Sequence, residues 1–311
     1  MEILTTIINV LIMFFYMIPA YILVKTGKAN PDHASTISSI LLYISFPAMI
    51  INSFQPIDFT YEILKQLMLF FVVTLILAAI SIVICYLILK KKFSEPKFRM
   101  LSIASSLGNV GFFGTPLIRG LYPNSPIVEC YSAIYSITVI MIGLTVGAYA
   151  LTMDKKFISV FSALYNQVTI AFLFGLIIFL ANWKFPKDLG NAISSLSKMS
   201  TPLCMQLLGI RLASVNFLDL FKKPFVYAIC LIKLFIYPLF TYLIIYFIPG
   251  LDKEFKASIF VLSAAPCASI IISLSEMLKA EQELSATVFL DTTVLCIITL
   301  PIITIILDKT I

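Results

Sequence analysis

The chain has 311 residues, of which 60% are hydrophobic and only 12% are charged. Soluble domains average about 45–50% apolar and about 25% charged residues, so this composition excludes an ordinary soluble protein. The formal net charge of +6 could suit a nucleic-acid-binding protein. However, the lysines are scattered through short loops between apolar runs, which is typical of membrane proteins and indicates orientation rather than a nucleic-acid partner.

Apolar runs of about 20 residues, enough to cross a bilayer core of ~30 Å, recur along the whole chain. The first run has no basic segment before it and no small-residue cleavage site after it, so it is predicted to be a retained span and not a signal peptide. We predict an all-α polytopic membrane protein with ten spans, at residues 3–25, 34–54, 63–89, 99–120, 127–153, 159–182, 190–212, 224–248, 257–278 and 285–307.

The basic residues predict the orientation. If the spans alternate in direction, the poorer side holds only Lys65, Arg119, Lys184, Lys187, Lys253, Lys256 and Lys309. The richer side, which carries the run 90–92 and Arg211 among others, should be cytoplasmic. The protein is therefore expected in the cell membrane with both termini on the non-cytoplasmic side.

The two halves of the chain resemble each other. "SSILLYISFPAMIINSF" in the second span is similar to "SSLSKMSTPLCMQLLGI" in the seventh, with Pro47 and Pro202 in similar places. Pro116 and Pro266 both lie among small residues in the fourth and ninth spans. With five spans in each half, residues 1–153 and 154–311 would form an inverted repeat, the plan of many secondary transporters, with a scaffold bundle and a transport bundle drawn from both halves.

The fourth and ninth spans are predicted to be broken. Proline removes one amide donor and displaces the carbonyl four residues earlier, which would free the carbonyls of Phe112 and Leu262. The run "LGNVGFFGTPL" adds three glycines that weaken the helix further. We expect the two broken helices to cross near the membrane midplane, where small residues allow close backbone approach.

Backbone groups freed inside a membrane must face protein, water or a ligand. Helix N-termini at such a crossing favour anions, and an asparagine supplies both a donor and an acceptor. A proline kink alone would need no ligand, but the combination favours a substrate site. Its candidate residues are Asn109, Gly111, Gly114, Thr115, Pro116, Ser263, Pro266 and Ser269.

Two charged residues, Lys233 and Asp291, lie deep within predicted spans. Each would cost at least ~2.5 kcal/mol at a helix centre, so each should face the protein interior. Asp291 is a candidate proton or sodium site and Lys233 a candidate counter-charge, while snorkelling or a structural ion pair remains the alternative. The cysteines show no C-x-x-C spacing and His33 is the only histidine, so we expect no metal site and no cofactor beyond such a coupling ion.

"GNVGFFGTPL" resembles the fourth-span motif of the auxin efflux carrier family, which includes bacterial carboxylate permeases and plant PIN-type auxin exporters. "SAAPCASIIISLSEML" and "SATVFLDTTVLCIITLPI" resemble its ninth and last spans. The resemblance implies ten spans, crossed broken helices, substrate contacts by Asn109 and by the backbone at 114–116 with the Pro266 region opposite, and a homodimer formed through the scaffold. The chain departs from the family in having Asn166-Gln167 in place of Asn-Pro, no second proline after Pro266, and no long polar central loop.

The sequence therefore predicts a secondary-active transporter of small organic anions, such as malate, malonate or an auxin-like acid. The alternative is a sodium- or proton-coupled exchanger or symporter with its ion site at Asp291. The sequence contains neither G-x-S-x-G nor H-E-x-x-H nor a pair of buried aspartates, so we expect no enzyme. A channel stays open as a further alternative, and so does a receptor, although a receptor would be expected to carry a signalling domain.

Overall fold

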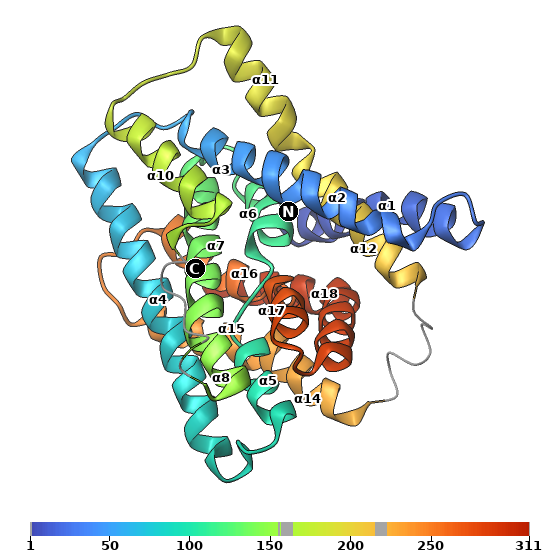
Figure 1. Cartoon of the computed structure of the whole chain (residues 1–311). Helices are drawn as coiled ribbons and strands as arrows, with labels where there is room; N and C mark the ends of the chain where they lie inside the picture. The colour runs from blue at the N-terminus through green and yellow to red at the C-terminus, as the bar shows by residue number, and fades with distance from the viewer. Residues whose placement is uncertain (1, 155, 157–163, 215–222, 311) are drawn as a thin grey trace.

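The computed structural model describes residues 2–154, 156, 164–214 and 223–310, and within these ranges every regular element of three or more residues is helical (Figure 1). Six described segments are long and apolar enough to cross a membrane. They are Ile7–Lys25, Pro31–Phe54, Tyr61–Lys92, Ile127–Thr152, Pro224–Tyr246 and Gln282–Leu307. These agree with the first, second, third, fifth, eighth and tenth predicted spans, and a polytopic membrane protein is confirmed. The full set of ten spans stays a prediction.

The first half begins with a single long helix and ends in a helix with a widened turn. Its α-helices are α1 (Glu2–Lys25), α2 (Ala34–Ile40), α3 (Phe46–Phe54), α4 (Tyr61–Leu89), α5 (Pro96–Ala104), α6 (Thr115–Leu121), α7 (Ile127–Ile142) and α8 (Ala148–Thr152). Short 3-10 turns cover Pro31–His33 and Lys90–Lys92, and π-helical turns cover Leu41–Ser45, Val110–Gly114 and Gly143–Gly147.

The described part of the second half is also helical. Its helices are α10 (Gln167–Leu180), α11 (Lys187–Lys198), α12 (Ser200–Ala213), α14 (Pro224–Leu231), α15 (Tyr237–Tyr246), α16 (Lys253–Ser263), α17 (Ile270–Leu278) and α18 (Gln282–Thr310), with a π-helical turn at Ile232–Ile236. The predicted sixth span is described only from residue 164 onward, and the seventh is divided between α11 and α12.

Of the four π-helical turns in the described ranges, three lie just before a proline. The turns Leu41–Ser45, Val110–Gly114 and Ile232–Ile236 each end two residues before Pro47, Pro116 or Pro238. A proline has no amide proton for the carbonyl one turn earlier, and its ring crowds that carbonyl. Widening the preceding turn relieves both problems without ending the helix.

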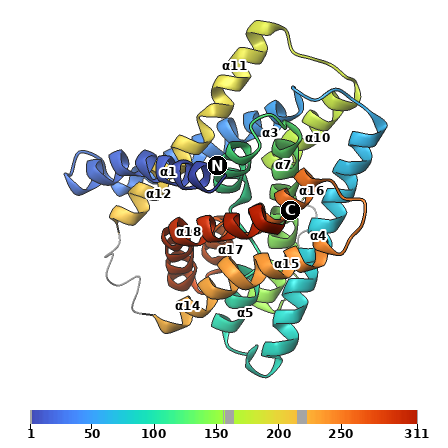
Figure 2. The same ribbon diagram turned by 180° about the vertical axis from the view of Figure 1, so that it is seen from behind.

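Helices from the two halves of the chain pack against each other. In Figures 1 and 2, α1 of the first half lies along α12 of the second half, and α4 lies along α7 within the first half. Gly209 makes the first contact possible, because a Cβ atom there would overlap the backbone carbonyl of Met17. The outer faces of α1 and α4 remain apolar and exposed, with Phe15 66% and Ile88 75% accessible, as expected for surfaces that face lipid.

Candidate functional site

Two helices of the structure are interrupted, and the interruptions contact each other. The first lies between α5, which ends at Ala104, and the turn that starts at Val110. The second lies between α16, which ends at Ser263, and α17, which starts at Ile270. Both fall within the spans that the sequence predicts to be broken.

The two interruptions satisfy each other's backbone groups. Gly108 and Cys267 form an isolated antiparallel bridge. The backbone amide of Asn109 donates to the Pro266 carbonyl at 2.6 Å, and the backbone amide of Ala268 donates to the Leu107 carbonyl at 2.9 Å. Unpaired backbone groups are costly in a membrane interior, so these bonds explain how both helices can be broken there.

Gly108 leaves little room for a side chain at this junction. A Cβ atom on Gly108 would lie 3.1 Å from the Lys233 ammonium nitrogen and 3.4 Å from the Ala265 carbonyl oxygen. On the other side, the Cys267 amide donates to the Thr292 hydroxyl of α18 at 3.0 Å. The junction is therefore held between Lys233 and α18.

Neither helix that precedes an interruption reaches its proline: Pro266 lies inside the second interruption, and Pro116 lies after the first. The helix α16 stops at Ser263, so Pro266 is outside it, and the Leu262 carbonyl accepts a hydrogen bond from the Ala265 amide at 3.2 Å. The expectation that Pro266 leaves this carbonyl free is therefore wrong. Pro116 is the second residue of α6, downstream of the first interruption, where its missing amide proton costs little.

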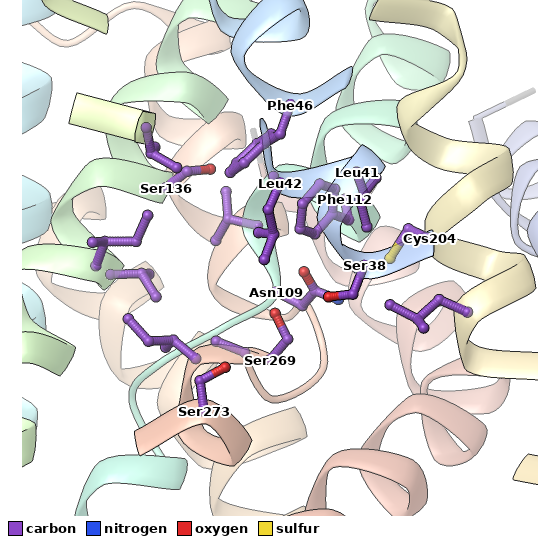
Figure 3. Close-up of a pocket in the computed structure, with 18 of the residues that line it drawn as sticks. Ser38, Leu41, Leu42, Phe46, Asn109, Phe112, Ser136, Cys204, Ser269 and Ser273 are labelled. Carbon is purple, nitrogen blue, oxygen red and sulfur yellow. The ribbon is translucent and has the colours of Figure 1, made fainter. Parts of the chain in front are cut away.

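A cavity of about 240 Å³ adjoins the junction (Figure 3). Its walls come from both halves of the chain and are mostly apolar. The lining residues are Ser38, Leu41, Leu42, Phe46, Gly108, Asn109, Val110, Gly111, Phe112, Ser136, Val139, Ile140, Leu144, Asn166, Gln167, Val168, Cys204, Leu207, Leu208, Arg211, Ala268, Ser269, Ile270, Ser273 and Phe289. An apolar cavity with a few converging polar groups is the usual form of a small-molecule site.

Three of the predicted site residues, Asn109, Gly111 and Ser269, line this cavity. Asn109 points into it from the first interruption, close to Ser269 from the second and to Ser38 from α2 (Figure 3). Asn109 is 4% exposed, and in the described part of the chain its side-chain amide nitrogen has no oxygen acceptor; the Cys204 thiol, a weak acceptor, is the side chain that interacts with it. A buried donor without a partner is costly unless a ligand or water accepts its proton.

The other predicted substrate residues lie outside the lining and have contacts of their own. The Thr115 hydroxyl bonds to that of Ser132 at 2.5 Å, and the Ser263 hydroxyl bonds to that of Thr241 at 2.9 Å. Gly114 packs against Leu262, where a Cβ atom would lie 2.8 Å from the leucine Cδ2. Pro266 lies within the second interruption and Pro116 in the first turn of α6, and neither proline lines the cavity.

Lys233 is fully buried beside the junction rather than in the cavity. Its ammonium donates to the Ser263 carbonyl, at the last residue of α16, at 2.6 Å and lies 5.0 Å from the centre of the Tyr237 ring. This places a positive charge at the negative end of a helix dipole. Among the described residues no acid forms an ion pair with Lys233.

Asp291, on α18, is 1% exposed and also lies outside the cavity lining. Neither of its carboxylate oxygens has a hydrogen-bond partner in the ranges that the structure describes. The interpretation of Asp291 and Lys233 as an ion pair therefore receives no support from the structure.

Sequence reasoning missed several cavity residues. Arg211 was used only for orientation, because it stands at the end of a predicted span where basic residues usually face water. Ser38, Phe46 and Phe289 gave no signal, since serines and phenylalanines occur throughout the apolar spans. Cys204 is one of six free cysteines, none of which stands in a recognisable motif, and its thiol borders the cavity.

A family model described as membrane transport protein matches the chain at residues 5–153 and 151–304. An uncharacterized transporter of Methanothermobacter thermautotrophicus is 25% identical over 211 residues, which covers 67% of each chain. An uncharacterized transporter of Methanocaldococcus jannaschii is 25% identical over 216 residues, which covers 66% of this chain and 68% of that relative. The two matches to the family model span nearly all of the described helices.

Proposed function

Because the chain belongs to the membrane transport protein family, the family of auxin efflux carriers, it is a transporter, and we propose that it carries small organic anions by alternating access around its two interrupted helices. Carboxylates such as malate or malonate and auxin-like aromatic acids are the substrate class. The relatives from the two archaea are named only as transporters, so the substrate rests on the site itself.

The buried side-chain amide of Asn109, which has no oxygen acceptor among the described residues, is the observation that carries this proposal. It offers a hydrogen-bond donor to a cavity that holds no Asp or Glu among its described lining residues. A buried donor favours a ligand rich in acceptors, and a carboxylate has two acceptor oxygens. A cationic substrate would therefore find no carboxylate among the described lining residues.

The proposed mechanism moves one bundle against the other around a fixed site. Residues 1–153 and 154–311 form the two inverted halves, and their interrupted helices cross near the membrane midplane. Contacts between the halves, such as α1 along α12, support mixed bundles. The cavity residues Ser38, Arg211 and Ser273 lie toward the ends of the predicted spans that follow Lys28, that stop near Ala213 and that stop before Lys279. We therefore propose that the cavity opens toward the side that we expect to be cytoplasmic.

Uptake of labelled acids into proteoliposomes tests the proposal. Malate, malonate and indole-3-acetate would be offered with and without pH or sodium gradients, and charge movement would be recorded in parallel. We expect uptake of at least one acid and its loss in Asn109→Ala, with normal folding. Asn191→Ala, on the exposed face of α11, is the matched control. Uptake that survives in Asn109→Ala would remove this residue from the site, and transport of none of the acids would contradict the anion carrier.

A second candidate is a proton- or sodium-coupled carrier that uses Asp291. The observation in its favour is the buried carboxylate with two unpartnered oxygens, since an intramembrane acid without a partner is often a coupling site. Cys230 and Lys223 are the titratable side chains that act on it electrostatically. Asp291→Asn is expected to abolish any dependence of transport on an ion gradient; coupling that persists in this variant would make Asp291 structural.

A further inference from the structure

Arg211, in the last turn of α12, lines the same cavity as Asn109. The chain has three arginines. Arg119 forms an ion pair with Glu129 at 3.1 Å, and the Arg99 guanidinium lies 3.4 Å from the Ser94 carbonyl. The guanidinium of Arg211 has neither a hydrogen bond nor an ion pair with any residue that the structure describes. Of the three, Arg211 is the arginine that lines the cavity, and all of its donors are available there.

The orientation of Arg211 is restricted by an aromatic ring. Its guanidinium carbon lies 5.8 Å from the centre of the Phe289 ring of α18, which also lines the cavity. A cation above an aromatic face is stabilised by the ring quadrupole. The ring cannot accept the in-plane N–H bonds of the guanidinium, so the fork of donors that matches a carboxylate stays unused.

The charge of Arg211 is not neutralised within the cavity. The carboxylate that acts on it electrostatically is Glu276, on the exposed side of α17, which forms no ion pair with it in the described structure and is not a lining residue. The surrounding walls are apolar, and a charge in apolar surroundings attracts a counter-ion more strongly than it would in water. The positive charge of Arg211 therefore favours the binding of one negative charge in the cavity.

We propose that Arg211 binds the carboxylate of the transported anion, and that the side-chain amide of Asn109 donates a further hydrogen bond to it. Leu42, Phe46 and Phe112 then receive the organic part of the substrate. This inference deepens the proposed anion transport and rests on it. Arg211 is the one cationic side chain among the described lining residues, so the second carboxylate of a diacid would be desolvated without a partner. Apolar monocarboxylates should bind more tightly than dicarboxylates.

Arginine modification by phenylglyoxal tests this site in the intact full-length protein in lipid nanodiscs. Mass spectrometry follows the rate at each of the three arginines while benzoate, indole-3-acetate, malonate or chloride is present at equal ionic strength. A monocarboxylate at ten times its Kd should slow modification of Arg211 about tenfold by mass action. The rate at Arg99, outside the cavity, should stay unchanged and serves as the internal control.

Three variants separate charge recognition from a structural role. Arg211→Gln should weaken binding of the protecting acid about tenfold or more, the scale of a lost charged hydrogen bond, and Arg211→Lys should lie between. Arg99→Gln removes the same charge elsewhere and should bind normally. Free guanidinium ion added to Arg211→Ala should restore binding, which a purely structural arginine would not show.

The outcomes distinguish this inference from the transport function. If an acid is transported and Asn109→Ala abolishes transport, but no acid protects Arg211, the role of Arg211 is refuted while the anion carrier stands. If no acid is transported and none protects, both fail. Equal protection by malonate and benzoate would refute the preference for a single carboxylate. Selective protection by benzoate or indole-3-acetate would support the whole inference.

Discussion

Gly111 lies where the structure leaves no space for a side chain. A Cβ atom at this position would overlap the Phe46 ring at its Cε2 and Cζ atoms and would lie 3.1 Å from the Ser136 hydroxyl. The ring is 4% exposed and packs on Phe112 with centroids 4.3 Å apart. In Gly111→Ala, Phe46 must therefore turn toward the cavity that it lines.

The magnitude follows from two opposing effects. Overpacking a tight site costs about 1–3 kcal/mol, and alanine favours a helical turn over glycine by about 1 kcal/mol. The difference is about 0–2 kcal/mol, so we expect Gly111→Ala to lower stability by about 1 kcal/mol. The displaced ring should also narrow the cavity and reduce the affinity for a protecting acid, so binding should suffer more than folding.

Thermal unfolding in detergent and acid binding measure the two effects. A stability change of 1 kcal/mol shifts Tm by roughly 2–4 °C for a chain of about 150–250 residues, so Gly111→Ala should melt a few degrees below the wild type. Gly190→Ala in α11 is the control, because its Cβ atom would lie 3.7 Å from Phe185, an ordinary contact. If the two variants have the same Tm and the same affinity, the reasoning about Phe46 is wrong.

Three further changes test other parts of the site. Lys233→Met leaves the Ser263 carbonyl unpaired, which costs about 1–3 kcal/mol. Part of this cost is offset because the variant no longer buries an ammonium group. We expect lost uptake with a modest fall in Tm, and a fully active variant would contradict this expectation. Asn166 accepts from the amides of Val168 and Thr169 at 3.0 Å, so Asn166→Ala should lose about 1 kcal/mol, whereas Asn166→Asp, which can still cap α10, should keep most of the wild-type Tm. With the other cysteines replaced, Cys204 should react with an impermeant thiol reagent from the cytoplasmic side, more slowly when substrate is bound. Reaction from the outer side alone would reverse the proposed orientation.

The sequence by itself determines the features that depend on local composition. Long apolar runs need no partner to be read as spans, and the structure has six of them as continuous helical segments. The cluster of glycines and the two prolines predict that the fourth and ninth spans are broken, because these residue types weaken a helix wherever they stand. Asn109 could be selected as a polar residue beside a break for the same reason.

Only the tertiary structure decides which groups meet. The backbone amide of Asn109 donates to the carbonyl of Pro266, and the Arg211 guanidinium lies over the Phe289 ring, although each pair is far apart in the sequence. Local patterns carry no information on such pairs, because each depends on how whole helices pack. The end of α16 at Ser263, before Pro266, is fixed in the same way. The Lys233 ammonium donates a hydrogen bond to the Ser263 carbonyl. The bridge between Gly108 and Cys267 supplies hydrogen bonds that a continued helix would otherwise have to provide.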